Sequence, residues 1–159
     1  MTVGTSIGLL ATVDGGAVWT RTTDPEVDLE GRALEGLSCP SPQDCVFLAE
    51  RISDQRSIFA RTTDGGSSWT TVAMPAQDQV VGVTCQTPSH CVAVGSFNDD
   101  DPAAFVSADG GATWSAGTVP RRPHTSSFFW VACPTVSHCV AVGPEGSAYT
   151  VDGGITWRT

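Results

Sequence analysis

The stretch Thr12-Val13-Asp14-Gly15-Gly16-Ala17-Val18-Trp19 decides the fold, because the chain contains four versions of it. Each version, which we call a box, has Ser or Thr two residues before an Asp, two Gly residues directly after the Asp and a Trp five residues after it. Since four of the five Trp residues lie in boxes, the repeat uses most of the indole surface of the chain. The Asp and Trp of the four boxes are Asp14 and Trp19, Asp64 and Trp69, Asp109 and Trp114, and Asp152 and Trp157.

Each box is typical of a hairpin turn with a structural role. Glycines after the Asp can adopt positive φ without steric cost, and the Asp carboxylate can accept backbone N–H groups of its own turn. The Trp then lies on the outgoing strand, where its ring covers apolar surface. A row of carboxylates or rings that binds a ligand is the alternative. Packing explains four copies better, because a reaction rarely needs the same residues four times.

The boxes resemble the Asp-box (BNR) repeat, S/T-x-D-x-G-x-T-W, which is found in β-propellers. Val18 and Ser68 depart from this pattern, because they stand where it prefers Thr. Sialidases, sorting-receptor ectodomains, some glycanases and the photosystem II stability/assembly factor family contain the repeat. The last of these is the most similar in blade layout, with a box in every repeat. The resemblance implies a propeller whose boxes lie on outer turns, away from the binding face, and it says little about activity.

The spacing of the repeats predicts an all-β fold, a β-propeller built from four-stranded antiparallel blades. Successive box Asp residues are 50, 45 and 43 positions apart. A period of about 40–50 residues with several short strands per unit indicates one blade per unit. We expect one propeller segment over residues 1–159, with about three and a half blades. The expected parts are a half blade at 1–23 and blades at 24–73, 74–118 and 119–159.

The first box lacks the strands that precede the other boxes, so the sequence starts in mid-blade and predicts an incomplete propeller. About four blades are the usual minimum for closure. Two explanations stay open: the chain is a piece of a longer propeller, or copies of it complete one another as a homo-oligomer. Bare strand edges on an open arc favour association.

Charge and hydropathy argue against two classes of partner. The chain has 17 acidic and 8 basic residues and a formal net charge of −9, whereas proteins that bind nucleic acid present basic patches. No run of 18 apolar residues is present, so we expect no membrane span. We also see no signal peptide, since residues 1–11 lack basic residues before their short apolar run.

The six cysteines form three C-x5-C pairs that follow the same repeat. Each pair flanks an expected turn between adjacent strands, which brings its Cα atoms within reach of a disulfide. Metal binding is less favoured, because C-x5-C is not the usual ligand spacing, and free thiols are the third option. Disulfides form in oxidising compartments, so we expect an extracellular or cell-surface protein. The predicted disulfides are Cys39–Cys45, Cys85–Cys91 and Cys133–Cys139.

One connection carries the best candidates for binding. Arg121, Arg122 and His124 lie between an outer strand and the next inner strand, and such connections approach the ligand face of propellers. In the following strand, Trp130 stands where the other blades have Gly. We expect its ring to reach the central channel or its mouth, beside the two arginines. The alternative is that Trp130 only fills the core.

An acidic turn, Asn98-Asp99-Asp100-Asp101, is a weaker candidate for a cation site. Hard cations such as Ca²⁺ prefer clustered carboxylates, but this turn lacks the alternating spacing of an EF-hand loop. A solvated turn is therefore the better explanation. We predict no metal and no cofactor.

No catalytic residue is evident in the sequence. Sialidase activity, as the resemblance would imply it, needs an arginine cluster and a Tyr–Glu pair, and Tyr149 with Glu145 lies on an outer hairpin. A two-carboxylate glycosidase needs paired acids across a pocket, and no pair stands out. The sequence therefore predicts a non-catalytic propeller module that contacts proteins or glycans. A sialidase-like glycoside hydrolase fragment is the alternative.

Overall fold

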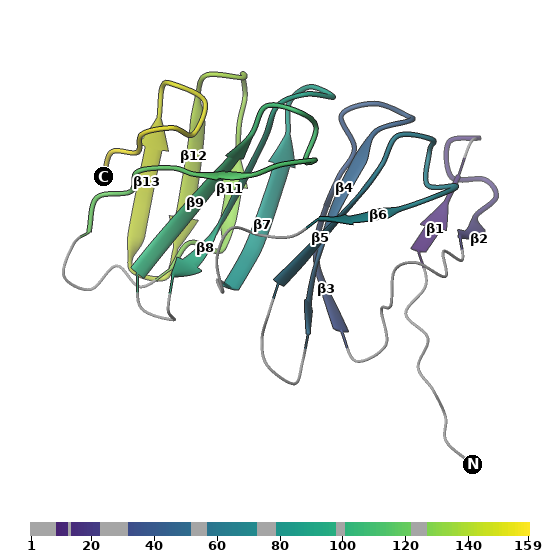
Figure 1. Ribbon diagram of the computed structural model, residues 1–159, viewed down its shortest axis with the longest axis horizontal. Helices are drawn as coiled ribbons and strands as arrows, with labels where there is room; N and C mark the ends of the chain where they lie inside the picture. The colour runs from purple at the N-terminus through teal and green to yellow at the C-terminus, as the bar shows by residue number, and fades with distance from the viewer. Residues whose placement is uncertain are drawn as a thin grey trace, which may run out of the picture.

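The structure is a computed structural model that describes residues 9–12, 14–22, 32–51, 57–72, 79–97, 101–121 and 127–159. Its strands form four antiparallel sheets that follow one another along the molecule (Figure 1). We call them blades one to four in chain order. Each strand pairs with its neighbours in sequence, so every blade is a meander, and the all-β prediction is confirmed. Within the described ranges, no helix is long and apolar enough to span a lipid bilayer.

The strand bounds follow the box repeat. Blade one contains β1 (Leu9–Ala11) and β2 (Thr20–Thr22). Blade two contains β3 (Arg32–Ser38), β4 (Cys45–Arg51), β5 (Ser57–Thr62) and β6 (Thr70–Val72). Blade three contains β7 (Gln79–Cys85), β8 (Cys91–Phe97), β9 (Asp101–Ser107) and β10 (Ser115–Ala116). Blade four contains β11 (Trp130–Ala132), β12 (Cys139–Gly143) and β13 (Gly146–Thr150).

The outer edge of blade four is closed by single bridges instead of a fourth strand. Tyr149 and Arg158 exchange two backbone hydrogen bonds of 2.8 Å. Thr118, which follows β10 of blade three, donates to the carbonyl oxygen of Ile155 at 2.8 Å and accepts from the N–H of Trp157 at 2.9 Å. The last box is therefore fixed both to its own blade and to the blade before it.

Each box forms a turn that is held by its own Thr or Ser and Asp. In the first box the Thr12 hydroxyl donates to Asp14 at 2.7 Å, and the N–H of Gly16 donates back to the Thr12 hydroxyl at 3.0 Å. Gly15 and Gly16 have φ values of 74° and 96°, a left-handed conformation that favours glycine. The other three boxes repeat these bonds, which confirms the predicted hairpin turns.

The core lies between successive blades, because one side of each sheet packs on the next. Phe59 of blade two contacts Trp114 of blade three, with ring centroids 4.6 Å apart. Val46 and Leu48 of β4 are fully buried in the same cluster. Val92 and Val94 of β8, which stand at matching places, are buried against blade four. The inner strands β3, β7 and β11 lie next to one another across these junctions.

Candidate binding site

The box carboxylates are the most regular acidic groups in the structure, and their oxygens already have donors. Asp64 accepts the Ser68 hydroxyl at 2.6 Å, the Ser68 N–H at 2.9 Å and the Thr62 hydroxyl at 2.7 Å. These bonds favour the charged form, and the Ser68 hydroxyl contributes most to lowering the pKa of Asp64 to about 2. Thr113 and Thr156 act in the same way on Asp109 and Asp152, whose pKa values also fall to about 2.

The first box lacks one of these hydrogen bonds, because Val18 stands where the other boxes have Ser or Thr. Val18 carries no hydroxyl, so Asp14 lacks the side-chain bond that Ser68 gives to Asp64; it accepts the Val18 N–H at 3.0 Å and the Thr12 hydroxyl at 2.7 Å. These two bonds still lower the pKa of Asp14, and the backbone N–H of Val18 is the main cause. In all four boxes the carboxylate is therefore ionised at neutral pH and occupied by its own turn, which makes it a poor general acid.

The three predicted disulfides are present, and they account for all six cysteines. In each pair the second cysteine begins β4, β8 or β12, and the first ends the inner strand of the same blade or follows it directly. The Cα atoms of each pair lie 4.0 to 4.1 Å apart, so the bridge closes one short loop per blade. Metal binding by these cysteines is thereby excluded in this structure.

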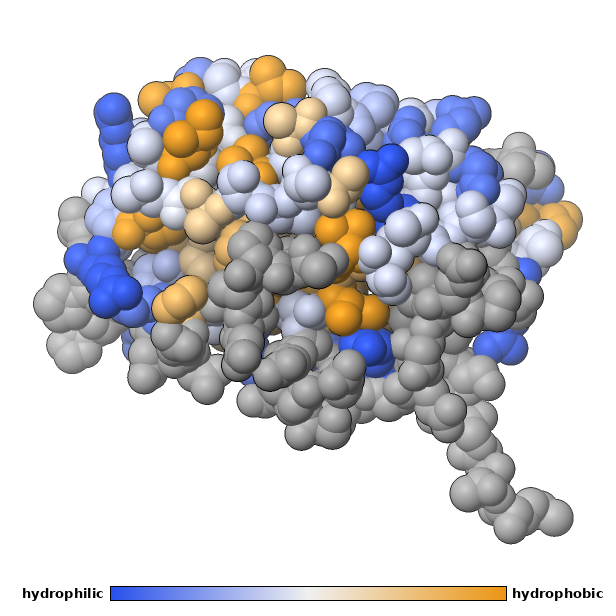
Figure 2. Space-filling view, in the orientation of Figure 1, coloured by the Kyte–Doolittle hydropathy of each residue, from blue (hydrophilic) through white to orange (hydrophobic). Residues whose placement is uncertain are grey.

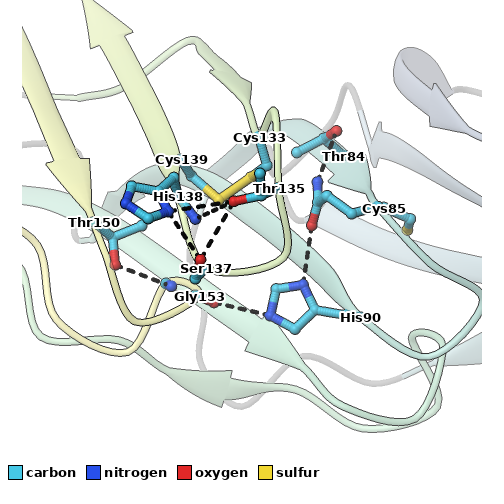
Figure 3. The surroundings of a disulfide bond; sticks show 12 residues. Thr84, Cys85, His90, Cys133, Thr135, Ser137, His138, Cys139, Thr150 and Gly153 are labelled. Carbon is cyan, nitrogen blue, oxygen red and sulfur yellow. Dashed lines mark hydrogen bonds between the residues drawn. A yellow bond between two sulfur atoms is a disulfide. The ribbon is translucent and has the colours of Figure 1, made fainter.

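His90 links blade three to blade four (Figure 3). Its Nε2 atom donates to the carbonyl oxygen of Gly153 at 3.1 Å, and its Nδ1 atom lies 2.9 Å from the side-chain amide of Gln86. His138 holds the same place one blade later, directly before a cysteine. Its Nδ1 atom lies 2.9 Å from the hydroxyl of Ser137 in its own loop (Figure 3).

A groove of about 570 Å³ lies between the third and fourth boxes. Its apolar wall includes Val136 and Ile155, whose side chains are half exposed. Its acidic members, Asp109 and Asp152, are hydrogen-bonded within their own boxes, so the groove offers mainly apolar contacts. The other lining residues are His90, Val106, Ala108, Thr113, Ser115, Ser137 and Gly153.

The end of the blades opposite the boxes carries an ion pair and two exposed aromatic side chains. An Arg121 guanidinium nitrogen lies 3.1 Å from a carboxylate oxygen of Asp101, and the Arg121 side chain is 77% exposed. Asp101 is paired in register with Phe97, the exposed last residue of β8. Phe129 lies near this end, because the N–H of the adjacent Phe128 donates to the carbonyl oxygen of Gly95 in β8 at 3.2 Å. Phe129 is exposed, and its ring packs edge-on against Trp130 with the centroids 5.8 Å apart. We call Phe97, Asp101, Arg121 and Phe129 the end patch.

Two of the predicted binding residues, Arg122 and His124, lie outside the described residues, as do residues 98–100 of the predicted acidic turn. Asp101, the last residue of that turn, is engaged by Arg121. Among the described residues, no group of three or more His, Cys, Asp or Glu side chains is arranged to hold a metal ion. A binding role for Arg121, Arg122 and His124 stays a prediction.

Trp130 lies at the start of β11, and its side chain is 67% exposed, so it does not fill the core. It is paired directly opposite Val142 of β12, and opposite residues of an antiparallel pair place their side chains on one face. Val142 is 40% exposed, whereas Ala141 beside it is buried against blade three. Trp130 therefore lies on the side of blade four that faces away from blade three. Its predicted role in binding stays a prediction.

Sequence reasoning missed the remaining members of this exposed side. Val140 and Tyr149 are paired in register, and their side chains are 47% and 45% exposed. The signal was the strict alternation in β12, which places Val140 and Val142 on one face and Cys139 and Ala141 on the other. Tyr149 thus stands on the flat side of a blade, which is not the position of a nucleophile at the centre of a propeller.

The comparisons with known proteins agree with this architecture. Residues 105–116 and 148–159, which contain the third and fourth boxes, match the family model described as BNR/Asp-box repeat. No curated protein matches the chain.

Among solved structures, the chain is similar to one described as "YCF48 bound to D1 peptide", with a TM-score of 0.64 and 18% sequence identity. The similarity covers 80% of this chain and 39% of the solved one, so the chain spans well under half the length of that structure. At this identity the similarity shows the fold, which is that of β-propeller blades. The propeller prediction is confirmed.

Proposed function

Because this chain is an Asp-box (BNR) repeat β-propeller segment, we propose that it is a non-catalytic module that binds a segment of another protein. The observation that carries the proposal is that the box carboxylates are hydrogen-bonded within their own turns. The regularly placed carboxylates are those of the boxes, and each one is occupied by donors of its own turn. Such groups hold a scaffold in place, and their carboxylates are not free to act in hydrolysis.

The end patch is the proposed contact surface. Aromatic residues and arginine are enriched at the centres of protein interfaces, and Phe97, Phe129 and Arg121 combine them on one exposed end. A guanidinium has five N–H donors, so Arg121 can hold a carboxylate of the partner while it stays near Asp101. Arg122 and His124 follow in the same connection. We therefore expect a partner segment that carries an acidic residue beside apolar ones.

The peptide in the similar solved structure supports this class of partner. That structure is described as bound to a peptide, and its blades match those of this chain at a TM-score of 0.64. Identity of the partner does not transfer at 18% sequence identity. Glycan contacts are the second option, because exposed aromatic rings can also stack on sugars. The three disulfides support an extracellular or cell-surface location.

The test selects peptides on the purified chain from a random peptide library displayed on phage. The affinity of selected peptides is then measured for the natural chain and for Phe97→Ala and Arg121→Ala. We expect each variant to weaken binding about tenfold or more, since aromatic and arginine anchors carry most of an interface energy. Ile155→Ala, on the box side of the molecule, is the matched control. Equal binding by all four proteins would refute the end patch as the site.

The alternative function, a sialidase-like glycoside hydrolase, follows from the occurrence of the same repeat in sialidases. A fluorogenic sialoside, incubated with the natural chain, tests it directly. We expect no release of the fluorophore above the buffer rate. Release that disappears in Tyr149→Phe would replace the binding proposal with the hydrolase.

A further inference from the structure

Two neighbouring blade junctions differ at one side chain that faces the following box. In blade two this residue is Arg61 and in blade three it is Val106, each directly before the Thr or Ser of its own box. The two residues hold the same place in register, since each pairs with the second residue of its blade's second strand. The side chain at this place therefore differs in charge and length between two junctions that otherwise repeat.

Arg61 reaches from blade two to the box of blade three. Its Nη1 atom donates a hydrogen bond of 3.0 Å to the backbone carbonyl oxygen of Asp109. A guanidinium carries five N–H donors in one plane, so it can bind a carbonyl oxygen and still offer donors to other acceptors. The space between these two boxes thus accommodates an arginine side chain.

Val106 leaves the same place open between blades three and four. Its side chain faces the fourth box, since a Cβ atom on Gly154 would lie 3.8 Å from the Cβ atom of Val106. Valine has no hydrogen-bond donor, so this place supplies none to the backbone carbonyl oxygen of Asp152. The groove of about 570 Å³ lies here, because Val106 and Asp152 both line it.

His90 also lines the groove, but it does not take the role of the arginine. Its Nε2 atom is bonded to the carbonyl oxygen of Gly153 at 3.1 Å, one residue beyond the carbonyl of Asp152. Its Nδ1 atom lies 2.9 Å from the side-chain amide of Gln86. Both ring nitrogens are engaged, so the place that Arg61 fills in the other junction stays open to a group from outside the chain.

The charge of the groove favours a basic partner. Asp109 and Asp152, one from each box, are exposed, and they are ionised at neutral pH because the pKa of each is about 2. Each carboxylate accepts three hydrogen bonds from its own box, and a carboxylate has about four acceptor positions. No Lys or Arg is among the described residues that line the groove. A cation from a partner therefore meets two negative charges that no basic side chain of the groove balances.

The apolar wall of the groove is specific to this junction. Val136 stands where the disulfide loop of blade three has Pro88, and Ile155 stands where the third box has Ala112. Val136 and Ile155 are 47% and 57% exposed. Apolar side chains gather over the blade-four end of the molecule (Figure 2). Blades three and four pack on each other through a buried cluster, so the groove belongs to a junction whose two sides are both present.

We propose that the groove binds a segment of a partner protein that carries an arginine next to an apolar side chain. The partner's arginine takes the place that Arg61 fills one junction earlier, and it donates to the carbonyl oxygen of Asp152. The apolar neighbour packs on Val136 and Ile155. This site is separate from the end patch, which lies at the opposite end of the blades and for which we expect an acidic segment.

The experiment titrates the full chain with a fluorescent peptide in which one arginine stands between two leucines and both ends are blocked. Fluorescence anisotropy measures the affinity, and we expect a dissociation constant below about 1 mM. Citrulline has nearly the shape of arginine but no charge, so a citrulline peptide should bind at least about tenfold more weakly. Binding of the arginine peptide should weaken as salt is added, because the two carboxylates are exposed.

Val106→Arg is the sharpest variant, because it gives blade three the side chain that blade two has at this place. The chain's own guanidinium should then fill the groove and weaken binding of the arginine peptide at least about tenfold. Val140→Arg, the same substitution at an exposed valine outside the groove, is the matched control that leaves the affinity unchanged. Ile155→Ala removes part of the apolar wall and should weaken binding at least about threefold. Circular dichroism checks that each variant is folded.

Three results would overturn the proposal. The first is equal affinity for the arginine and citrulline peptides, and the second is no binding below about 1 mM. The third is an affinity that Val106→Arg and Ile155→Ala leave unchanged, or that Phe97→Ala lowers instead, since Phe97 lies in the end patch. In the library experiment, a selected peptide that loses affinity only for Ile155→Ala would support the groove, whatever the outcome for the end patch.

Discussion

His90 of blade three and Gly153 of blade four are joined across their junction by a hydrogen bond of 3.1 Å between Nε2 and the carbonyl oxygen. The contact links the disulfide loop of one blade to the box turn of the next. It adds a directional bond to a junction that otherwise consists mainly of apolar side chains.

Replacement of His90 tests how much this hydrogen bond stabilises the folded chain. We expect His90→Ala to lower the free energy of unfolding by about 1–2 kcal/mol, since it removes a hydrogen bond and leaves a partly buried carbonyl group without its donor. Urea unfolding followed by circular dichroism measures the change. His138→Ala is the matched control, because within the described residues His138 bonds only to its own loop, and it should change stability by less than about 0.5 kcal/mol.

The box tryptophans should divide into two groups. Trp114→Ala removes a side chain that is 6% exposed and stacked on Phe59, so we expect a loss of about 3–5 kcal/mol in unfolding free energy. Trp19→Ala removes a ring that is 56% exposed, and its cost in dilute solution should be below about 1 kcal/mol. Chemical unfolding of both variants provides the comparison. Similar losses for the two would show that the first box is buried in solution.

Acid should destabilise the fold through the boxes. The pKa of Asp64, Asp109 and Asp152 is about 2 in the folded chain, against an ordinary value of 3.8. Between these values the unfolded chain binds more protons than the folded one, so stability rises with pH there. The contribution is complete above about pH 5 and is lost as the pH falls through 4 towards 2.

Thermal unfolding between pH 6 and pH 2.5 measures this effect. We expect the midpoint to fall steadily below about pH 4.5. Asp109→Asn and Asp152→Asn each remove one of the shifted groups, so these variants should start from a lower midpoint at pH 6 and lose less on acidification. A flat profile in the natural chain would mean that the boxes keep their bonds when protonated.

The disulfides should stabilise each blade by a modest amount. Each closes a loop between cysteines six positions apart, and loops this short give about 2 kcal/mol in the chain-entropy model. We expect the double replacement of Cys85 and Cys91 by Ser to lower the free energy of unfolding by that amount. Alkylation without reductant, followed by mass spectrometry, should find no free thiol in the natural chain. Labelling of any cysteine under those conditions would contradict the assigned pairs.

The sequence was sufficient to predict the blades, the box turns and the disulfides, because their determinants are local. Thr62, Asp64 and Gly66 lie within five consecutive positions, and their hydrogen bonds connect them to one another. The end patch could not be predicted in full. Its ion pair joins Arg121 to Asp101. The sequence does not indicate with which Asp or Glu an exposed arginine forms an ion pair.

The side of the sheet on which Trp130 lies was also beyond sequence reasoning. The inner strands of blades two and three shift register, between Leu34 and Gly36 and between Val80 and Gly82. Such a bulge reverses the alternation of side chains along a strand, so counting from a buried residue gives the wrong face. The exposure of Val140 was equally hidden, because Val92 is the same residue type at the same place and is buried.

The short range of the disulfides has a consequence for the synthesis of the protein. The two cysteines of each pair belong to one blade, and the hydrogen bonds of each box connect residues no more than four positions apart. A blade that emerges from the ribosome or from a translocation pore can therefore oxidise its own loop and close its own turn before the next blade exists. The nearest thiol is always the correct partner, so the order of translation itself guards against mispaired cysteines.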